Sequence, residues 1–78
     1  MDELKLVAAS NIIKLRTDAG MTQAELGERL SYSDKSISKW ERADALPDAC
    51  VLKQMAEIFG VSIDYLLTEH DAWESEQD

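Results

Sequence analysis

Apolar residues recur at helical spacing in the first part of the chain. Five of them stand three or four positions apart, as on one face of an amphipathic helix: Leu4, Ala8, Ile12, Leu15 and Ala19. Gly20 then supplies a helix stop, so the pattern predicts a helix over about residues 2–19. Leu6 and Ile13 fall outside this face and leave apolar surface that the helix does not need for its own core.

Three later helix starts share one pattern of apolar and polar positions. An apolar residue precedes a hydroxyl residue, and a second apolar residue stands four positions after the hydroxyl. This hydrophobic staple fixes the angle at which a chain enters a helix, as steeply crossing helices require. The hydroxyl residues are Thr22, Ser33 and Ser62, and Thr22 also forms a capping box with Glu25.

These starts, together with Pro47 as a helix breaker and Gly60 as a stop, predict four further helices. Gly27 lies inside one of them, where glycine costs about 1 kcal/mol relative to alanine, and we attribute it to close packing of the third helix on the second. Because no alternating strand pattern occurs, we predict an all-α fold, a compact five-helix bundle that contains a helix-turn-helix. The expected bounds of the four helices are residues 23–30, 34–42, 48–59 and 63–67.

Charge is unevenly distributed along the chain. The 78 residues carry a net charge of −8, whereas a DNA-binding domain usually shows a basic face. Residues 64–78 hold six acids and no lysine or arginine, while residues 14–42 carry a net charge of +1. Helical periodicity is also lost from Thr68 onward, so we predict one domain over residues 1–67 and an acidic tail, disordered or a linker, over residues 68–78. Six of the eight excess negative charges lie in residues 64–78, so the acidity weakens the DNA-binding role that a helix-turn-helix suggests without removing it.

The remaining composition argues against several classes of protein. Cys50 is the only cysteine, so no internal disulfide forms, and we expect a reducing, cytoplasmic setting with a packing role for this thiol. His70 has no second ligand at metal-binding spacing, so neither a metal nor a cofactor is expected. The longest apolar run, residues 6–9, is too short to span a membrane. No nucleophile–base pair, paired acids or glycine-rich phosphate loop is present, so we do not expect an enzyme.

Several short motifs match one known family in register. They are Asn11-Ile12 with Leu15-Arg16, Gly20-Met21-Thr22-Gln23, Leu26-Gly27 with Leu30, Ile37-Ser38-Lys39-Trp40-Glu41-Arg42, Pro47-Asp48, and Gly60-Val61-Ser62-Ile63-Asp64-Tyr65-Leu66-Leu67. With these motifs the chain resembles the helix-turn-helix family of phage Cro and repressor proteins, also called the xenobiotic-response-element type, over about residues 8–67. The resemblance implies a five-helix domain that binds operator DNA, commonly as a two-fold dimer.

Two positions depart from the pattern of the resembled family. The family usually has glycine where this chain has Ser31, because the backbone of the turn is left-handed there, and it often has glycine where this chain has Ala43. A non-glycine residue in the left-handed region costs roughly 1–2 kcal/mol. We therefore predict that the substitution Ser31→Gly stabilises the domain.

The polar face of the helix over residues 34–42 is the expected DNA-contact surface. Such a helix enters the major groove, where lysine donates to guanine O6 and N7 and serine pairs with several bases. Asp34 either complements the helix dipole or accepts a hydrogen bond from cytosine N4. A phosphate contact by Gln23, at the start of a helix, is implied by the resemblance. The expected DNA contacts are Gln23, Ser33, Asp34, Lys35, Ser36, Ser38 and Lys39, with Arg16 and Arg42 as weaker phosphate candidates.

Purely structural interpretations stand beside these roles. Lys35 and Lys39, taken without the surrounding motif, are solubilising residues on an exposed face. Trp40 is expected to pack in the core, and Glu41 and Arg42 to tie their helix to its neighbours. The last helix holds either surface residues or, as in the resembled family, a dimer contact formed by Ile63, Tyr65 and Leu67.

Two functions from different classes follow. The leading hypothesis is a sequence-specific transcriptional regulator, a repressor that acts as a homodimer and reads the major groove of double-stranded DNA with residues 34–42. The alternative is an antitoxin-like or anti-repressor protein-interaction module, in which the acidic tail with Trp73 binds a basic protein partner. The net charge of −8 is the main support for this alternative.

Overall fold

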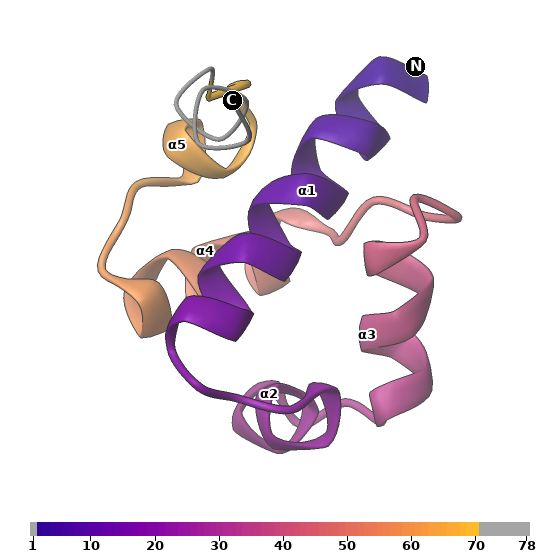
Figure 1. Ribbon diagram of the computed structural model, residues 1–78, viewed down its shortest axis with the longest axis vertical. Helices are drawn as coiled ribbons and strands as arrows, with labels where there is room; N and C mark the ends of the chain where they lie inside the picture. Colours follow the sequence, from indigo (N-terminus) through magenta and orange to yellow (C-terminus); the bar gives the residue numbers. More distant parts are fainter. Residues whose placement is uncertain (1, 71–78) are drawn as a thin grey trace, which may run out of the picture.

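Five helices make up the part of the chain that the computed structural model describes, residues 2–70 (Figure 1). No strand occurs among these residues, and the predicted all-α, five-helix fold is confirmed. Most of the expected acidic tail, with Trp73, lies outside the described residues. The helices are α1 (Asp2–Asp18), α2 (Gln23–Leu30), α3 (Asp34–Glu41), α4 (Ala49–Phe59) and α5 (Ile63–Leu66).

The observed helix bounds differ from the expected ones by one residue at four ends, and at three of these the residue in question is a cap. Asp48 precedes α4, and its carboxylate accepts a hydrogen bond from the backbone N–H of Val51 at 2.9 Å. Arg42 and Leu67 are the C-caps of α3 and α5. A cap is half in the helix, so a sequence pattern readily assigns it to the helix itself.

The predicted N-caps of α2, α3 and α5 are confirmed. Thr22 accepts a hydrogen bond from the Glu25 backbone at 3.0 Å, and the Glu25 carboxylate accepts one from the Thr22 N–H at 2.8 Å, which completes the capping box. Ser33 and Ser62 each accept from the backbone N–H three residues later, at 3.4 and 2.9 Å. Caps of this kind are typically worth about 1 kcal/mol each, a large contribution in a domain of this size.

Four helices end in the same left-handed turn. After each, a backbone N–H donates to the carbonyl five residues earlier, for example from Asp44 to Lys39 at 2.9 Å, which is the Schellman arrangement. The turn residues have φ of 73°, 64°, 62° and 70° at Gly20, Ser31, Ala43 and Gly60. The left-handed backbone expected at Ser31 is therefore confirmed, and Ala43 shares it without being glycine.

The core takes one large apolar side chain with no exposed surface from each helix: Ile12, Leu26, Ile37, Met55 and Leu66. Burial of each such side chain contributes about 1.5–3 kcal/mol. Trp40 joins them at 8% exposure, as predicted. The apolar face of α1 extends beyond this core, because Leu4 is 37% exposed and Ala19, past the end of the helix, is also exposed.

The expected packing role of Cys50 is wrong. Its thiol is exposed in the first turn of α4. The inner face of this helix is formed by Val51, Leu52, Met55 and Ala56, and Cys50 shares the outer side with the exposed Lys53 and Glu57. Hydrophobicity alone suggested burial, whereas the helical position of the residue decides its exposure.

Gly27 permits a close backbone approach in the helix-turn-helix. A Cβ atom at this position would lie 2.6 Å from the carbonyl oxygen of Tyr32 and 3.2 Å from the carbonyl carbon and oxygen of Ser33. The prediction of close packing at Gly27 is confirmed, but the neighbour is the turn backbone that leads into α3. This contact fixes how far α3 stands from α2.

Asn11 is a buried polar residue of α1 that anchors the end of the domain. Its side-chain amide donates to the backbone carbonyls of Tyr65 at 3.2 Å, Leu66 at 2.7 Å and Thr68 at 3.0 Å. The last carbonyls of a helix have no partner within the helix, so a buried side-chain donor is needed to satisfy them. Asn11 thus attaches α5 and the following residues to α1.

Candidate nucleic-acid interface

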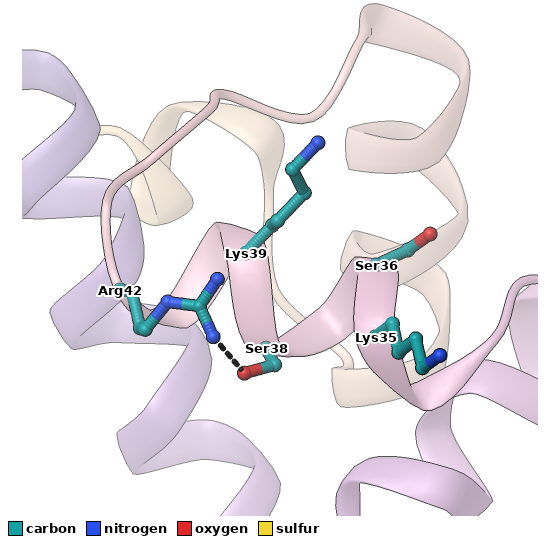
Figure 2. Close-up of a pocket in the computed structure, with 5 residues that line it drawn as sticks. All are labelled: Lys35, Ser36, Ser38, Lys39 and Arg42. Atoms are coloured by element: carbon teal, nitrogen blue, oxygen red, sulfur yellow. Dashed lines mark hydrogen bonds between the residues drawn. The ribbon is translucent and has the colours of Figure 1, made fainter.

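One helix carries the polar surface that the sequence analysis singled out. In Figure 1, α3 lies along an edge of the molecule with α1 and α2 on one side of it. Ile37 and Trp40 face the core from this helix. The opposite face forms an open hollow of about 520 Å³, shown in Figure 2 and lined by Lys35, Ser36, Ser38, Lys39 and Arg42. We call these five residues the outer face of α3.

The outer face of α3 carries three cationic side chains, and the acid at the end of the helix points away from them. The Glu41 side chain is only 6% exposed and forms a two-pronged ion pair with Arg16 of α1. Arg16 Nε donates to Oε2 at 2.6 Å and Nη2 donates to Oε1 at 3.0 Å. The expectation that Glu41 ties α3 to a neighbour is confirmed, and Lys35 and Lys39 remain on the exposed side.

Arg16, expected as a weak phosphate contact, has its guanidinium bonded within the chain. Besides the two bonds to Glu41, its Nη1 donates to the Met21 carbonyl at 2.8 Å. The Arg16 side chain is 14% exposed. These bonds join α1, the turn that follows it and the end of α3.

Gln23 belongs to the same network. It lies half-buried in the first turn of α2, and its Nε2 donates to Glu41 Oε1 at 2.9 Å. An amide nitrogen carries two N–H groups, so one remains for a further acceptor. Glu41 therefore connects Gln23, the expected phosphate contact, with α3, the helix expected in the major groove.

Besides Arg16 and Gln23, two more expected contacts lie apart from the outer face of α3. Ser33 is the N-cap of α3, and Asp34 is the acid in its first turn, where a negative charge complements the helix dipole. Both residues are exposed. They line a second open hollow that is acidic, together with Ala24, Glu25, Glu28 and Tyr32. The turn itself is braced by an edge-to-face contact between the rings of Tyr32 and Trp40, whose centroids are 5.3 Å apart.

Two residues to which the sequence analysis gave no role position parts of the domain. Asp44 accepts hydrogen bonds from Arg42 Nε at 3.0 Å and Nη2 at 2.9 Å, so Arg42 binds the loop after its helix. Asn11 holds α5, as described above. A sequence signal for the role of Asp44 is its neighbour Ala43, which stands where the resembled family often has glycine. A left-handed residue at that position turns the chain, and with it Asp44, back toward α3.

The three residues expected at a dimer contact differ in exposure. Ile63 is 37% exposed. Tyr65 is half-buried and stacks on the His70 ring, with centroids 3.9 Å apart, while Leu67 is half-buried against the core. Of the three, Ile63 offers the most accessible apolar side chain on α5.

No helix within residues 2–70 is long and apolar enough to cross a membrane. The same residues contain no group of three or more metal-ligating side chains.

Comparisons with known proteins agree with this geometry. A family model described as helix-turn-helix matches residues 12–66. The chain is 38% identical over 71 residues to the uncharacterized HTH-type transcriptional regulator y4dJ of Sinorhizobium fredii, covering 91% of each protein. It is 42% identical over 55 residues to the HTH-type transcriptional activator BcrR of Enterococcus faecalis, covering 70% of this chain but only 27% of BcrR. Both relatives are described as regulators rather than as enzymes.

A solved structure extends the likeness to three dimensions. The P22 c2 repressor in complex with a synthetic operator has a TM-score of 0.75 and 30% sequence identity, over 81% of this chain and 96% of the repressor chain. The helix arrangement, the matched residues and the relatives all indicate the same family. The chain belongs to the helix-turn-helix family of Cro and phage-repressor type, a family of DNA-binding transcriptional regulators.

Proposed function

We propose that this protein is a sequence-specific transcriptional regulator that inserts α3 into the major groove of an operator. The observation that supports this most is the outer face of α3, which presents two lysines and two serines. Of the two acids of this helix, Glu41 is paired inside with Arg16, and Asp34 lines the separate acidic hollow at the turn. A groove-reading helix needs exposed donors and a nearby positive potential.

The proposed contacts divide into base readout and positioning. Lys35 and Lys39 donate to guanine O6 and N7, and the serine hydroxyls contact further base edges. Gln23 uses its remaining N–H on a phosphate at the start of α2, where the helix dipole favours an anion. Arg16 acts indirectly, since its guanidinium bonds hold Glu41 in place for Gln23.

We further propose a homodimer that represses transcription by occupying its operator. Ile63 supplies exposed apolar surface on α5 for a two-fold contact, and Asn11 fixes the backbone of that helix. A dimer would read two half-sites about 34 Å apart. The similarity to an operator-bound phage repressor supports repression, whereas BcrR is an activator of which this chain spans 27%.

The test is selection of binding sites from a random duplex DNA library with the purified protein, at about 50 and 150 mM salt. We expect enrichment of an inverted repeat whose half-sites are about 10 base pairs apart. Lys35→Ala should relax the preference at one base pair, while Gln23→Ala should weaken binding to all sequences alike. Lys53→Ala is the matched control, because Lys53 is 73% exposed on α4 and pairs with Glu57.

The protein-interaction function is retained as a second candidate because of the net charge of −8. A chain truncated after His70 distinguishes the two, since it removes four acids and Trp73 but keeps the bond from Asn11 to Thr68. Loss of binding to a basic protein partner, with no site enriched from the DNA library, would favour the second candidate. Enrichment by the truncated chain would favour DNA binding.

A further inference from the structure

Three residues at the end of the outer face of α3 form a connected unit, and the inference drawn from them rests on the proposed DNA-binding function. Arg42 Nη1 donates to Ser38 Oγ at 2.8 Å, the bond drawn in Figure 2. Its other nitrogens, Nε and Nη2, donate to Asp44 Oδ2 at 3.0 and 2.9 Å. The guanidinium is thus held from one side by Asp44 while it bonds Ser38 on the other.

The backbone explains why Asp44 is in reach. Ala43 is left-handed with φ of 62°, and the Asp44 N–H donates to the Lys39 carbonyl at 2.9 Å. This turn brings the residue two positions beyond Arg42 back beside the helix. Asp44 consequently sets the position of the guanidinium over Ser38.

The bond from Arg42 determines what Ser38 can offer to a ligand. A hydroxyl has one O–H donor and two lone pairs, and free serine therefore pairs with donors and acceptors alike. Here a cationic N–H occupies one lone pair, and the positive charge repels other donors from the oxygen. No residue among the described 2–70 accepts a hydrogen bond from the Ser38 hydroxyl, so its proton is available to an acceptor.

We propose that Arg42, held by Asp44, makes Ser38 a hydrogen-bond donor toward the DNA and thereby a specificity-determining residue. At the base pair that it reaches, Ser38 selects an acceptor edge: purine N7, guanine O6 or thymine O4. It disfavours cytosine, whose major-groove group is the N4 donor. Arg42 acts as a positioning residue through Ser38, which separates this role from a simple phosphate contact.

The experiment compares base preferences selected by the full chain and its variants from the random duplex library. Ser38→Ala identifies the base pair concerned, because the preference there should disappear. Arg42→Met should reduce the same preference by about threefold to tenfold, the effect of one hydrogen bond, and should add nothing in the Ser38→Ala background. Arg29→Met is the matched control, since it removes an arginine exposed in the last turn of α2.

Asp44→Ala supplies a second, independent readout. It removes a negative charge near the DNA and releases Arg42, so affinity for all sequences should rise while the preference at the Ser38 base pair falls. Arg42 and Asp44 side chains are 60% and 50% exposed, and exposed ion pairs contribute little to stability. Both variants should therefore fold, which circular dichroism and thermal melting verify.

The outcomes separate the inference from the function on which it rests. If Arg42→Met weakens all sequences uniformly and lowers the salt dependence by about one phosphate, Arg42 is a phosphate contact and the inference is overturned. A preference that Ser38→Ala leaves unchanged overturns it as well. No enrichment by the unmodified chain overturns the proposed function, and the inference with it.

Discussion

Gly27 and Ser31, four residues apart, place opposite demands on the backbone of the helix-turn-helix. Gly27 has an ordinary helical backbone but no room for a Cβ atom, since the Tyr32 oxygen would lie 2.6 Å from it. Ser31 has room for its side chain but a φ of 64° that disfavours one. The two positions therefore respond to substitution in opposite directions.

Gly27→Ala should destabilise the domain. The overlap with a backbone carbonyl cannot be relieved by a side-chain rotation, so the cost of overpacking, about 1–3 kcal/mol, outweighs the better helix propensity of alanine. We expect a melting temperature at least about 5 °C lower, measured by circular dichroism. Glu28→Ala, on the exposed side of the same helix, should change it little. An unchanged melting temperature for Gly27→Ala would show that α3 can shift freely.

Ser31→Gly should stabilise the domain by about 1 kcal/mol, because glycine adopts the left-handed region without the clash of a Cβ atom. Ala43→Gly should do the same at the end of α3. Each substitution should raise the melting temperature by about 4–8 °C. Ser31→Ala is the control and should give no increase. A melting temperature that stays the same or falls in Ser31→Gly would refute the prediction.

Among the elements, α5 is the one most dependent on a single side chain. The helix has four residues, too few to be stable alone, and its last carbonyls are bonded by the Asn11 amide from α1. Any dimer contact on α5 would therefore also depend on Asn11.

Asn11→Ala should cost about 1–3 kcal/mol, since it leaves the buried Leu66 carbonyl without a donor. Asn11→Asp should cost more, because a carboxylate would face three carbonyl oxygens. Hydrogen exchange of the amides in residues 63–68 should increase before that of α2 and α3. Wild-type stability in Asn11→Asp would mean that the amide is not the anchor of α5.

At this scale the sequence predicts local features such as caps and turns, but not the contacts between helices. The N-caps Thr22, Ser33 and Ser62 and the turn at Ser31 were predictable, because a cap or a Schellman turn depends on residues within one helical turn. The partners of Arg16 and Asn11 were not. Glu41 lies 25 positions from Arg16, and the carbonyls bound by Asn11 lie 54 to 57 positions away. Such pairs follow from how whole helices cross, which local patterns do not specify.

For the candidate site, sequence reasoning predicted the shared face of α3 but not where the other expected contacts lie. It proposed nine DNA contacts, and five of them line one hollow on α3. Arg16 and Gln23 instead share Glu41, and Ser33 and Asp34 lie on the acidic side of the turn. The helical period of α3 predicted the shared face, whereas the ion pair of Glu41 required the neighbouring helix α1.

At the scale of the whole molecule, we expect the excess of acid to lower the affinity for DNA. Residues 71–78 hold four of the sixteen acids, and they follow directly on a domain with a net-positive central segment. Repulsion from the DNA backbone by these charges falls with added salt, since the Debye length is about 10 Å at 0.1 M.

Replacing the four acids by their amides, Asp71→Asn, Glu74→Gln, Glu76→Gln and Asp78→Asn, should therefore tighten DNA binding several-fold at about 50 mM salt. The gain should shrink as the salt concentration rises, and fluorescence anisotropy titrations at several concentrations measure it. The base preferences should not change, since these charges act on all sequences alike. Weaker binding by the substituted chain would indicate that the acidic residues support the complex.

The packing role of α3 and its proposed DNA contacts fall on separate side chains. Ile37 and Trp40 hold the fold together, while Lys35 and Lys39 are exposed and belong to neither the core nor the ion pair of Glu41. Mutations at the exposed positions can accumulate over generations without endangering the folded state. Related proteins could in this way acquire new operators one base pair at a time, with every intermediate still able to fold.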